Sequence, residues 1–499
     1  MQNLFFPGSS ALLTDLYQLT MAYGYWKSGR ADTLANFQLY FRKQPFNGGF
    51  SVACGLAPAL EWVENFGFDA SDLQYLGTLK GADDKALFEP KFLDYLGELK
   101  LEIDVDAMPE GTICFAQEPL LRVQGPILQC QLLETALLNI INFQTLIATK
   151  AARIVLAARG EAVLEFGARR AQNIDGALSA SRAAFVGGVA ATSNVLAGKL
   201  FGIPVKGTHA HSWVMLFDSE IEAFETYADA LPNNVVFLVD TYDTLEGVRH
   251  ACEVGRKLRE KGHDLLGIRL DSGDLAYLSI EARKILDENG FPDATIFASN
   301  DLDEHLISSL KEQGAQIAVW GVGTRLVTGH DQPALGGVYK LTAIRDDETQ
   351  AWQPRVKLSE QSVKISTPGV VGARRYFSEE GGKCQNVADA IYEVGAPLRG
   401  GLVIVDPLDP LHRRRIAGNL SSRELLEPMV RGGNRVAQVP ELCDSRDRTL
   451  RELQNFAPGI KRFVNPHVYP VGLEASLHEK KMDLVLQARG LAGGKDAEN

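Results

Sequence analysis

The sequence lacks several features that would place it in a class at once. Its six cysteines lie far apart and form no Cys-x-x-Cys pair, which indicates neither a disulfide framework nor a zinc site. No run of about 20 uncharged apolar residues occurs, so no membrane span is predicted. The first residues, MQNLFFPGSS, have no positive region followed by a long apolar run, and no secretory signal is expected. The cytoplasm is therefore the expected location.

The sequence also lacks an excess of basic residues. A net charge of −12 and a pI near 5.4 argue against general binding to nucleic acid or to an anionic membrane, because both require a basic face. An anionic substrate is still allowed if arginines and lysines gather locally. The composition, 45% apolar and 23% charged, is typical of a globular protein. At roughly 150 residues per domain, the length predicts about three domains, or two with one large.

An alternating pattern runs from about Ala162 to Val327. Short apolar runs rich in β-branched residues end in polar residues, and amphipathic segments separate them at the spacing of β/α units. Continuous apolar strands indicate a parallel sheet covered on both faces. Six such runs in one region predict a closed or nearly closed α/β barrel rather than an open sheet. They are AVLEFGARRA, IPVKGTHAHSW, NVVFLVDTYD, DLLGIRLDSGD, ATIFASND and QIAVWGVGTRLV.

The polar residues of these runs gather at the carboxyl ends. In α/β barrels this end carries the active site, so we expect one chamber to receive them all. The residues are Phe166 and Arg169, His209 and His211, Asp240 and Asp243, Arg269 and Asp271, Ser299 to Asp301, and Gly321 to Thr324.

The remaining residues form two further segments. Residues 1–140 contain a helix ended by Gly29 and a strand, LANFQLYFRKQPF, and predict an N-terminal α+β domain. A long helix from about residue 128 to 159 leads into the barrel, which we assign to 141–342. Residues 343–499 contain turn-rich strands and a charged helical section. We expect this C-terminal segment to pack on the N-terminal domain and to end in a helical extension and a frayed tail.

The WGVGT motif follows the last apolar run. Its two glycines allow close approach of a ligand to the backbone, whose N–H groups can point at a phosphate, as late βα loops of barrels often do. A tight βα turn is the alternative interpretation.

Two arginines stand next to each other in EFGARRA. A strand would aim Arg169 and Arg170 at opposite faces, so one of them is expected to meet an anion in the chamber. A guanidinium suits a planar carboxylate because two parallel charge-assisted bonds fix its orientation. A structural ion pair is the alternative for each arginine.

Carboxylates end two other runs. Arg269 and Asp271 are two residues apart and share a face, which fits a magnesium–phosphate substrate or, alternatively, a simple salt bridge. Asp240 and Asp243 suggest the same kind of substrate site at the end of their own run. Alternatively, Asp243 is the cap of the helix that begins near Thr244.

The two histidines of GTHAHS allow three interpretations. His209 and His211 share a face and could bind a metal, but the other strand ends offer no further histidine, so a zinc hydrolase lacks its ligands. Either ring could be a hydrogen-bonded structural residue. Alternatively, one is a nucleophile, because neutral imidazole is abundant at pH 7 and can attack a phosphoryl group.

Eight stretches of residues 11–330, taken in order, resemble those of the nicotinate phosphoribosyltransferase family, whereas residues 370–499 carry little that matches by motif. The resemblance implies a type II phosphoribosyltransferase fold, with an irregular α/β barrel beside an N-terminal α+β domain completed by C-terminal segments. The stretches are LLTDLYQLTMAYGYW, EFGARRAQ, ATSNVLAGK, GTHAHSWV, VDTYDT, IRLDSGDL, ASNDLDE and WGVGTRLVTG.

The resemblance also implies a reaction and an assembly. Nicotinate would be joined to 5-phosphoribosyl 1-pyrophosphate (PRPP) to give nicotinate mononucleotide and pyrophosphate, in NAD biosynthesis. ATP hydrolysis would be coupled through a phosphohistidine, and Mg²⁺ would accompany PRPP and ATP. The chain would work as a homodimer with shared active sites, with no tightly bound zinc and no nucleic-acid or membrane partner.

Matching the motifs residue by residue assigns roles that the resemblance implies. His211 would be the phosphorylated histidine and His209 would line the same pocket. Phe166, together with Tyr17 from the partner subunit, would stack on the two faces of the pyridine ring. Arg169 and Arg269 would lie around the ring and its carboxylate. Asp240 and Asp271 would lie near the ribose and magnesium. Gly321, Gly323 and Thr324 would cradle the 5′-phosphate, and Arg42, Lys43, Lys357 and Lys364 would bind the pyrophosphate and ATP phosphates.

Ser193 bears on the choice between acid and amide. The related nicotinamide phosphoribosyltransferase is similar in the barrel but has an aspartate at the corresponding position, which would repel the carboxylate of nicotinate, whereas a hydroxyl can donate to it. Ser193 therefore favours nicotinate. Three other functions remain as alternatives: nicotinamide phosphoribosyltransferase, a metal-dependent barrel hydrolase, and a non-catalytic sensor of phosphoribosyl ligands.

Overall fold

The computed structural model describes residues 11–398, 401–438 and 440–491. The chain forms two compact units, one of Met1–Leu146 with Ala334–Asn499 and the other of Ile147–Pro333. The first unit thus combines N-terminal and C-terminal segments of the chain, as the predicted completion of the N-terminal domain by C-terminal segments requires.

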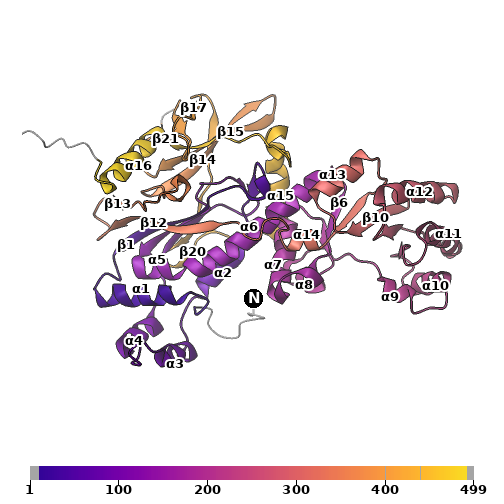
Figure 1. Cartoon of the computed structure of the whole chain (residues 1–499), viewed down its shortest axis with the longest axis horizontal. Coiled ribbons are helices and arrows are strands. Elements are labelled where there is room, and N and C mark those ends of the chain that lie inside the picture. Colours follow the sequence, from indigo (N-terminus) through magenta and orange to yellow (C-terminus); the bar gives the residue numbers. More distant parts are fainter. Residues whose placement is uncertain (1–10, 399–400, 439, 492–499) are drawn as a thin grey trace, which may run out of the picture. The chain divides into compact units, whose positions relative to one another are not determined.

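The first unit is built on a seven-stranded antiparallel sheet. One of its inner strands is β1 (Leu34–Phe41), a mostly apolar strand that is buried along nearly its whole length and ends just before the cations Arg42 and Lys43. β1 pairs with β5 (Leu121–Pro126) on one side and with β12 (Gly337–Arg345) on the other, so strands about 300 residues apart lie side by side (Figure 1). The order is completed by β13 (Gln353–Pro354) beside β12, and by β3 (Asp104–Ala107), β19 (Glu427–Arg431) and β20 (Asn434–Arg435) beyond β5.

The C-terminal residues form a second, six-stranded sheet in the same unit. Its strand order is β17-β16-β21-β15-β14-β18, with the long hairpin of β14 (Val371–Glu380) and β15 (Lys383–Glu393) near one edge. The other strands are β16 (Val403–Val405), β17 (Arg413–Arg415), β18 (Ser421–Glu424) and β21 (Val471–Glu474), and the helices are α15 (Leu442–Gln454) and α16 (Ala475–Ala488).

A buried ion cluster ties α15 to this hairpin. Arg375 of β14 has no exposed surface and makes a paired contact with Asp389 of β15, which is also fully buried. Arg375 Nη1 reaches Glu452 of α15 at 3.0 Å. Two carboxylates share the arginine, so this charge is compensated within the protein rather than by water.

Helices cover the first sheet of this unit. α1 (Leu16–Lys27) ends where predicted, because Gly29 adopts a positive φ of 68° that favours glycine. The predicted long helix is two helices, α5 (Ile127–Leu132) and α6 (Glu134–Ala157). The others are α2 (Leu56–Glu64), α3 (Ala70–Thr78) and α4 (Pro90–Glu98), and a two-stranded sheet joins β2 (Ser51–Val52) to β4 (Ile113–Cys114).

Within the described part of the chain, α6 alone is long and apolar enough to cross a membrane, although the sequence analysis found no such segment. Of its most apolar 18-residue window, 72% is buried within the protein. That burial is typical of the core helix of a folded domain, which meets the same criteria of length and composition.

The second unit contains the predicted parallel sheet. The strands run β7-β6-β11-β10-β9-β8, and this order follows the chain around a ring with one break, between β7 and β8. A single parallel bridge from Thr192 to Val205 extends the β7 edge toward the break. The sheet is therefore a barrel that is nearly closed. Its strands are β6 (Ala162–Glu165), β7 (Ala191–Thr192), β8 (Val236–Leu238), β9 (Gly267–Leu270), β10 (Thr295–Asn300) and β11 (Val319–Val322).

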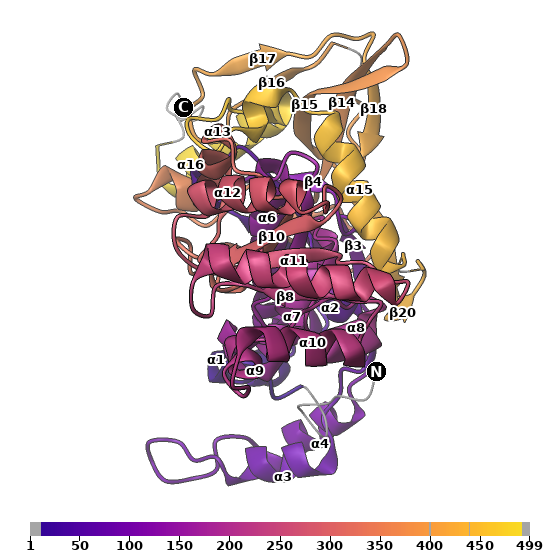
Figure 2. The ribbon, with the colours of Figure 1, turned by 90° about the vertical axis from the view of Figure 1, so that its right-hand side faces the viewer.

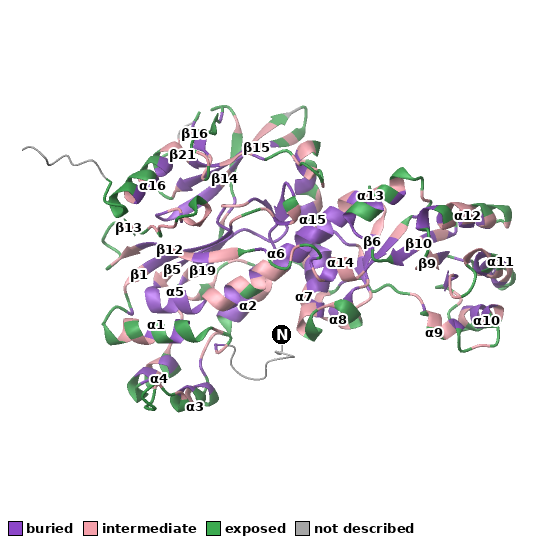
Figure 3. Ribbon diagram, viewed as in Figure 1, coloured by how far each residue is buried: buried purple, intermediate pink, exposed green. Residues whose placement is uncertain are grey.

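Amphipathic helices cover the outside of this barrel. In α11 (Thr244–Glu260), apolar residues at helical spacing, including Val248, Ala251, Cys252 and Leu258, are buried against the sheet. Figure 2 shows α10 (Glu220–Ala230), α11 and α12 (Leu275–Glu288) layered over β8 and β10. Figure 3 shows the strands buried and the outer helix faces exposed. The other helices are α7 (Asn173–Val186), α8 (Val195–Phe201), α9 (His211–Val214), α13 (Glu304–Glu312) and α14 (Thr324–Val327).

Candidate active site

Phe166 leaves the end of β6 at the carboxyl edge of the barrel. Its backbone N–H donates to the carbonyl of Val322 on β11 at 2.8 Å, and its side chain is half-buried. A Cβ on Gly321 would lie 2.7 Å from Cδ2 of the Phe166 ring, closer than such atoms approach. Gly321, predicted to cradle a phosphate, thus makes room for an aromatic ring; Gly323 and Thr324 follow it at the start of α14.

The charge of one predicted arginine, Arg169, acts on the other, Arg269. Arg169 lies exposed in a short 3-10 turn after Phe166, and Arg269 is half-buried near the end of β9. Burial is the main reason that the pKa of Arg269 is lowered, and the nearby charge of Arg169 lowers it further, while Asp271 and Asp240 raise it. The Nε atom of Arg269 is buried without a hydrogen-bond partner. Two cations and two carboxylates therefore gather at this edge.

His209 does not present its ring to this chamber in the way that the sequence analysis expected. The ring is buried among aromatic side chains, with Tyr227 at 4.8 Å between centroids, and its Nε2 accepts a hydrogen bond from the backbone N–H of Leu238 at 3.2 Å. Leu238 belongs to β8, the strand at the break, so the imidazole takes the place of a missing strand neighbour. The backbone carbonyl of His209 accepts from Nη2 of Arg269 at 2.9 Å.

The protonation state of His209 follows from these contacts. A backbone N–H can only donate, so Nε2 carries the lone pair and the proton is on Nδ1. Burial lowers the pKa of His209 to about 4 from its usual 6.5. The ring is therefore neutral at pH 7 and is bound to the β8 edge of the break.

His211 is the accessible histidine of the pair. It begins α9 and has a 38% exposed side chain. Its Nδ1 lies 3.1 Å from Oγ1 of Thr241, and its Nε2 lies 3.7 Å from Oδ2 of Asp271. The second distance exceeds that of a hydrogen bond, so the carboxylate influences Nε2 without binding it closely. Nδ1 of His211 is therefore held by Thr241, whereas Nε2 remains accessible.

The two carboxylates of the chamber are organised differently. Oδ2 of Asp240 accepts from the backbone N–H of Asp271 and from the hydroxyl of Ser272, each at 2.8 Å, whereas Oδ1 is buried without a partner. The hydroxyl of Ser299 donates to Oδ1 of Asp271. Asp243 caps α11, which was the structural alternative for that residue.

These carboxylates suit a magnesium ion that arrives with a phosphorylated substrate. In residues 11–398, 401–438 and 440–491, no group of three or more His, Cys, Asp or Glu side chains could hold a metal ion. Mg²⁺ commonly binds through one or two carboxylates, with water and substrate phosphates completing its shell. The unpartnered Oδ1 of Asp240 and the exposed part of Asp271 fit that pattern.

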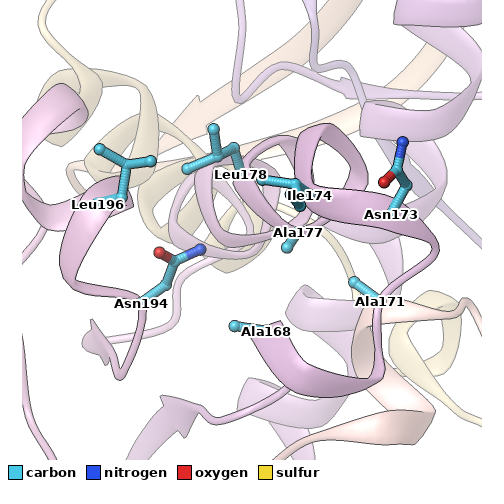
Figure 4. Close-up of a pocket in the computed structure, with 8 residues that line it drawn as sticks. All are labelled: Ala168, Ala171, Asn173, Ile174, Ala177, Leu178, Asn194 and Leu196. Atoms are coloured by element: carbon cyan, nitrogen blue, oxygen red, sulfur yellow. The ribbon is translucent and has the colours of Figure 1, made fainter. Parts of the chain in front are cut away.

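Ser193 lies at the end of β7, half-buried, and its backbone N–H donates to the carbonyl of Glu165 at 2.9 Å. A hollow of ≈ 380 Å³ adjoins this turn. Its wall combines Ala168 and Ala171 beside Arg169, part of α7, and Asn194 and Leu196 after Ser193 (Figure 4). Most of the residues in this wall are apolar, and several of them are close neighbours in the chain of the predicted Arg169 and Ser193.

The other predicted phosphate ligands and Tyr17 belong to the first unit. Lys43 and Lys357 are exposed, Arg42 and Lys364 are half-buried, and Tyr17 on α1 is about half exposed. Lys340 on β12, which the sequence analysis missed, lies near Arg42 and Lys357. Burial lowers the pKa of Lys340, Glu134 opposes this, and the charges of Arg42 and Lys357 lower it further. Three cations, Arg42, Lys340 and Lys357, are thus close enough for their charges to interact.

Sequence reasoning also missed Thr241 and Glu165. Thr241 follows Asp240 directly and could have been found by the same position at a strand end. Glu165 looked like an ordinary strand residue, because nothing local shows that its carboxylate is buried and accepts several hydrogen bonds.

Comparisons with known proteins agree with this geometry. Three family models match: the nicotinate phosphoribosyltransferase N-terminal domain over residues 12–142, the nicotinate phosphoribosyltransferase family over 162–368, and the C-terminal domain over 373–481, where little had matched by motif. The Bacillus subtilis nicotinate phosphoribosyltransferase is 43% identical over 96% of both chains, and the Arabidopsis thaliana nicotinate phosphoribosyltransferase 2 is 38% identical over 95% of this chain and 94% of that protein.

The fold agrees as well. The crystal structure of human nicotinic acid phosphoribosyltransferase matches with a TM-score of 0.82 and 32% identity, covering 94% of this chain and 99% of that one. Similarity that spans the whole length, together with the strand-end residues described above, leads to one conclusion. The chain belongs to the nicotinate phosphoribosyltransferase family.

Proposed function

We propose that this chain joins nicotinate to PRPP, giving nicotinate mononucleotide and pyrophosphate, and that ATP hydrolysis is coupled to this transfer through His211. Membership of the family carries the reaction class. The site assignment is supported by the gathering of Arg169, Arg269, Asp240 and Asp271 at the carboxyl ends of the barrel strands. Opposite charges at one edge suit a substrate that brings both anionic phosphates and a metal ion.

The nicotinate subsite combines a ring and two donors. Phe166 offers an aromatic face for the pyridine ring, and the exposed guanidinium of Arg169 follows it by three residues. Ser193 offers a hydroxyl that can donate to the carboxylate, whereas an aspartate there would repel it. Tyr17 of a second copy would stack on the opposite face of the pyridine ring.

The phosphoribosyl subsite uses the carboxylates. Oδ1 of Asp240 and the carboxylate of Asp271 would hold magnesium or the ribose hydroxyls. When bound, magnesium would neutralise charge on the pyrophosphate oxygens. Gly323 and Thr324 would bind the 5′-phosphate by backbone N–H and hydroxyl groups, with Gly321 supporting Phe166 beside them.

The transfer itself needs little covalent help from the protein. The bond from the anomeric carbon to the pyrophosphate oxygen breaks with that oxygen taking the electron pair, and the sugar acquires oxocarbenium character. The lone pair of the pyridine nitrogen then forms the bond to the anomeric carbon, so no base has to remove a proton. The protein contributes position and charge, with Arg42, Lys43, Lys340, Lys357 and Lys364 as cations for the pyrophosphate and ATP phosphates.

His211 would act as the phosphoryl acceptor. Its Nε2 attacks the γ-phosphorus of ATP, the bond to the β,γ-bridging oxygen breaks, and ADP leaves with that electron pair. Thr241 fixes the ring through Nδ1 at 3.1 Å, so the accessible nitrogen keeps a defined direction. Asp271, 3.7 Å from Nε2, would attract the proton of that nitrogen when the ring is protonated. The neighbouring His209 cannot serve, because its Nε2 accepts from Leu238.

A homodimer with shared sites is part of this proposal. Four large apolar or aromatic side chains on α1 or just before it are exposed to solvent: Leu13, Leu16, Tyr17 and Met21. Together they form an apolar face that the described part of the chain leaves exposed. In the second unit, Ile174, which lines the hollow of Figure 4, is exposed, and so is Val195, which stands in the chain between the lining residues Asn194 and Leu196. A second copy that covers such faces would bring Tyr17 to a site that lacks its second aromatic ring.

Product formation from nicotinate or nicotinamide with PRPP, each with and without ATP, tests the function. We expect turnover with nicotinate and stimulation by ATP. Preferred use of nicotinamide would favour the related amide enzyme, and tightly bound zinc at one ion per chain would favour a metal hydrolase. Label from [γ-³²P]ATP should be acid-labile and base-stable, and His211→Ala should abolish it. If the protein shows neither phosphate label nor turnover, the alternative of a non-catalytic sensor of phosphoribosyl ligands is favoured.

A further inference from the structure

We propose that Glu165 is a positioning residue for nicotinate, because its buried carboxylate holds the turns of residues 166–170 and 192–194 in one arrangement and thereby sets the affinity for this substrate. The inference rests on the proposed nicotinate subsite, to which these turns contribute Phe166, Arg169 and Ser193. Glu165 itself contacts no substrate in this proposal.

Glu165 occupies the point where three site segments meet. It is the last residue of β6 and has no exposed surface. In the sheet it stands between Thr192 of β7 and Val322 of β11. Its backbone carbonyl accepts from the N–H of Ser193 at 2.9 Å. A movement of Glu165 would therefore displace the ends of both neighbouring strands, β7 and β11.

One carboxylate oxygen fixes the first turn. Oε1 accepts from the backbone N–H of Gly167, two residues further along the chain. This bond turns the chain out of the strand after Phe166 and into the short helical turn that carries Arg169. Space is limited on the other side, because a Cβ on Gly167 would lie 2.4 Å from Cγ1 of Val327. The turn is thus held between a carboxylate and an apolar wall.

The other oxygen fixes the second turn. Oε2 accepts from the hydroxyls of Thr192 at 2.6 Å and Ser181 at 2.8 Å. The hydroxyl oxygen of Thr192 in turn accepts from the backbone N–H of Asn194 at 2.9 Å, and the amide of Asn194 donates to Ser181 at 3.2 Å. Ser193 lies within this closed set of bonds. The same carboxylate therefore orients the serine and the arginine that we place around the nicotinate carboxylate.

The chemistry of the group makes Gln a sharp test. An ionised carboxylate has only acceptor sites and can take the N–H and both hydroxyls at once, whereas an amide keeps one acceptor oxygen and presents an NH₂ to the other donors. Glu165→Gln preserves volume, and the Ser181 hydroxyl has the carbonyl of Ala177 at 2.9 Å as another acceptor, so the variant should fold. The two turns should then lose their common anchor.

Glu161→Gln is the matched control. Glu161 directly precedes the same strand at its opposite end, where its carboxylate accepts from Trp320 Nε1 at 2.7 Å and pairs with Lys311 at 2.6 Å. A second pair keeps the test independent of Glu165 itself: Thr192→Val removes the hydroxyl and Thr192→Ser retains it. Each variant is measured by steady-state kinetics with nicotinate and PRPP varied separately, and by thermal unfolding.

We expect Glu165→Gln and Thr192→Val to raise KM for nicotinate about tenfold or more, because small misplacements of positioning groups are costly, and to change KM for PRPP less than about threefold. Glu161→Gln and Thr192→Ser should leave both KM values within about twofold. If Glu165→Gln and Thr192→Val only lower the unfolding temperature, as a purely structural role requires, the proposal is wrong.

Phe166→Ala separates this failure from that of the subsite. If Phe166→Ala raises KM for nicotinate while Glu165→Gln and Thr192→Val do not, the subsite stands and the role of Glu165 falls. If Phe166→Ala also leaves KM for nicotinate unchanged, the subsite assignment fails and this proposal fails with it.

Discussion

The position of the Phe166 ring depends on a glycine in the neighbouring strand, and this contact can be tested by one added methyl group. In Gly321→Ala, the new Cβ would lie 2.7 Å from Cδ2 and 2.8 Å from Cε2 of the ring. Ordinary contacts of a Cβ begin at about 3.4 Å, so the ring must retreat by roughly 0.7 Å or rotate. The strand cannot yield easily, because β11 is paired on both sides.

Two effects of different size should follow. Overpacking at a close contact lowers the free energy of unfolding by about 1–3 kcal/mol. A displaced ring loses part of an aromatic contact with the pyridine worth about 0.5–1.5 kcal/mol, which corresponds to roughly a twofold to tenfold rise in KM for nicotinate. KM for PRPP should change little, because Gly321 supports the ring rather than the phosphate.

The assay is steady-state formation of nicotinate mononucleotide with one substrate saturating and the other varied. Gly67→Ala is the control, since a Cβ there would meet nothing within 4 Å. A changed KM for PRPP with an unchanged KM for nicotinate would instead make Gly321 part of a phosphate cradle and refute the reasoning. Unchanged kinetics in a fully folded variant would refute both assignments.

Three further predictions concern single side chains. Arg375→Met leaves the fully buried Asp389 without its arginine partner, so the free energy of unfolding in urea should fall by about 3–5 kcal/mol. Arg374→Met, at a half-exposed pair, should lose less than about 1 kcal/mol, and equal losses would contradict the argument. Because the pKa of His209 is about 4 when folded and 6.5 when unfolded, the unfolded chain binds the proton first and stability should fall as pH drops from about 6.5 towards 4. His209→Gln, which keeps an acceptor for Leu238, should lose this part of the pH dependence in thermal melts, and an unaltered profile would count against it. Ser193→Asp should lower kcat/KM for nicotinate tenfold or more, on the order of 1.4 kcal/mol, and an unchanged value would remove the acid-over-amide argument.

The sequence predicted those features that depend on neighbours along the chain. Apolar runs with polar residues at their carboxyl ends, separated by amphipathic segments, predicted the nearly closed barrel, because strand and helix periodicity are local properties. The same local order put Phe166, His211, Asp240 and Asp271 at one edge of the sheet. The family motifs then indicated the nicotinate phosphoribosyltransferase family before any contact was known.

Only the tertiary structure decided which of these side chains are accessible and which are held. The two histidines of GTHAHS look equivalent in the sequence. In the structure, the ring of His209 accepts a hydrogen bond from Leu238 at the break in the barrel between β7 and β8, whereas His211 remains accessible. Likewise, Gly321 adjoins the ring of Phe166, and the carboxylate of Glu165 accepts from Thr192 and Ser181, contacts that no local pattern in the sequence indicates. The physical reason is that strand pairing and burial bring together groups tens to hundreds of residues apart, and a buried donor or acceptor takes whichever partner that packing supplies.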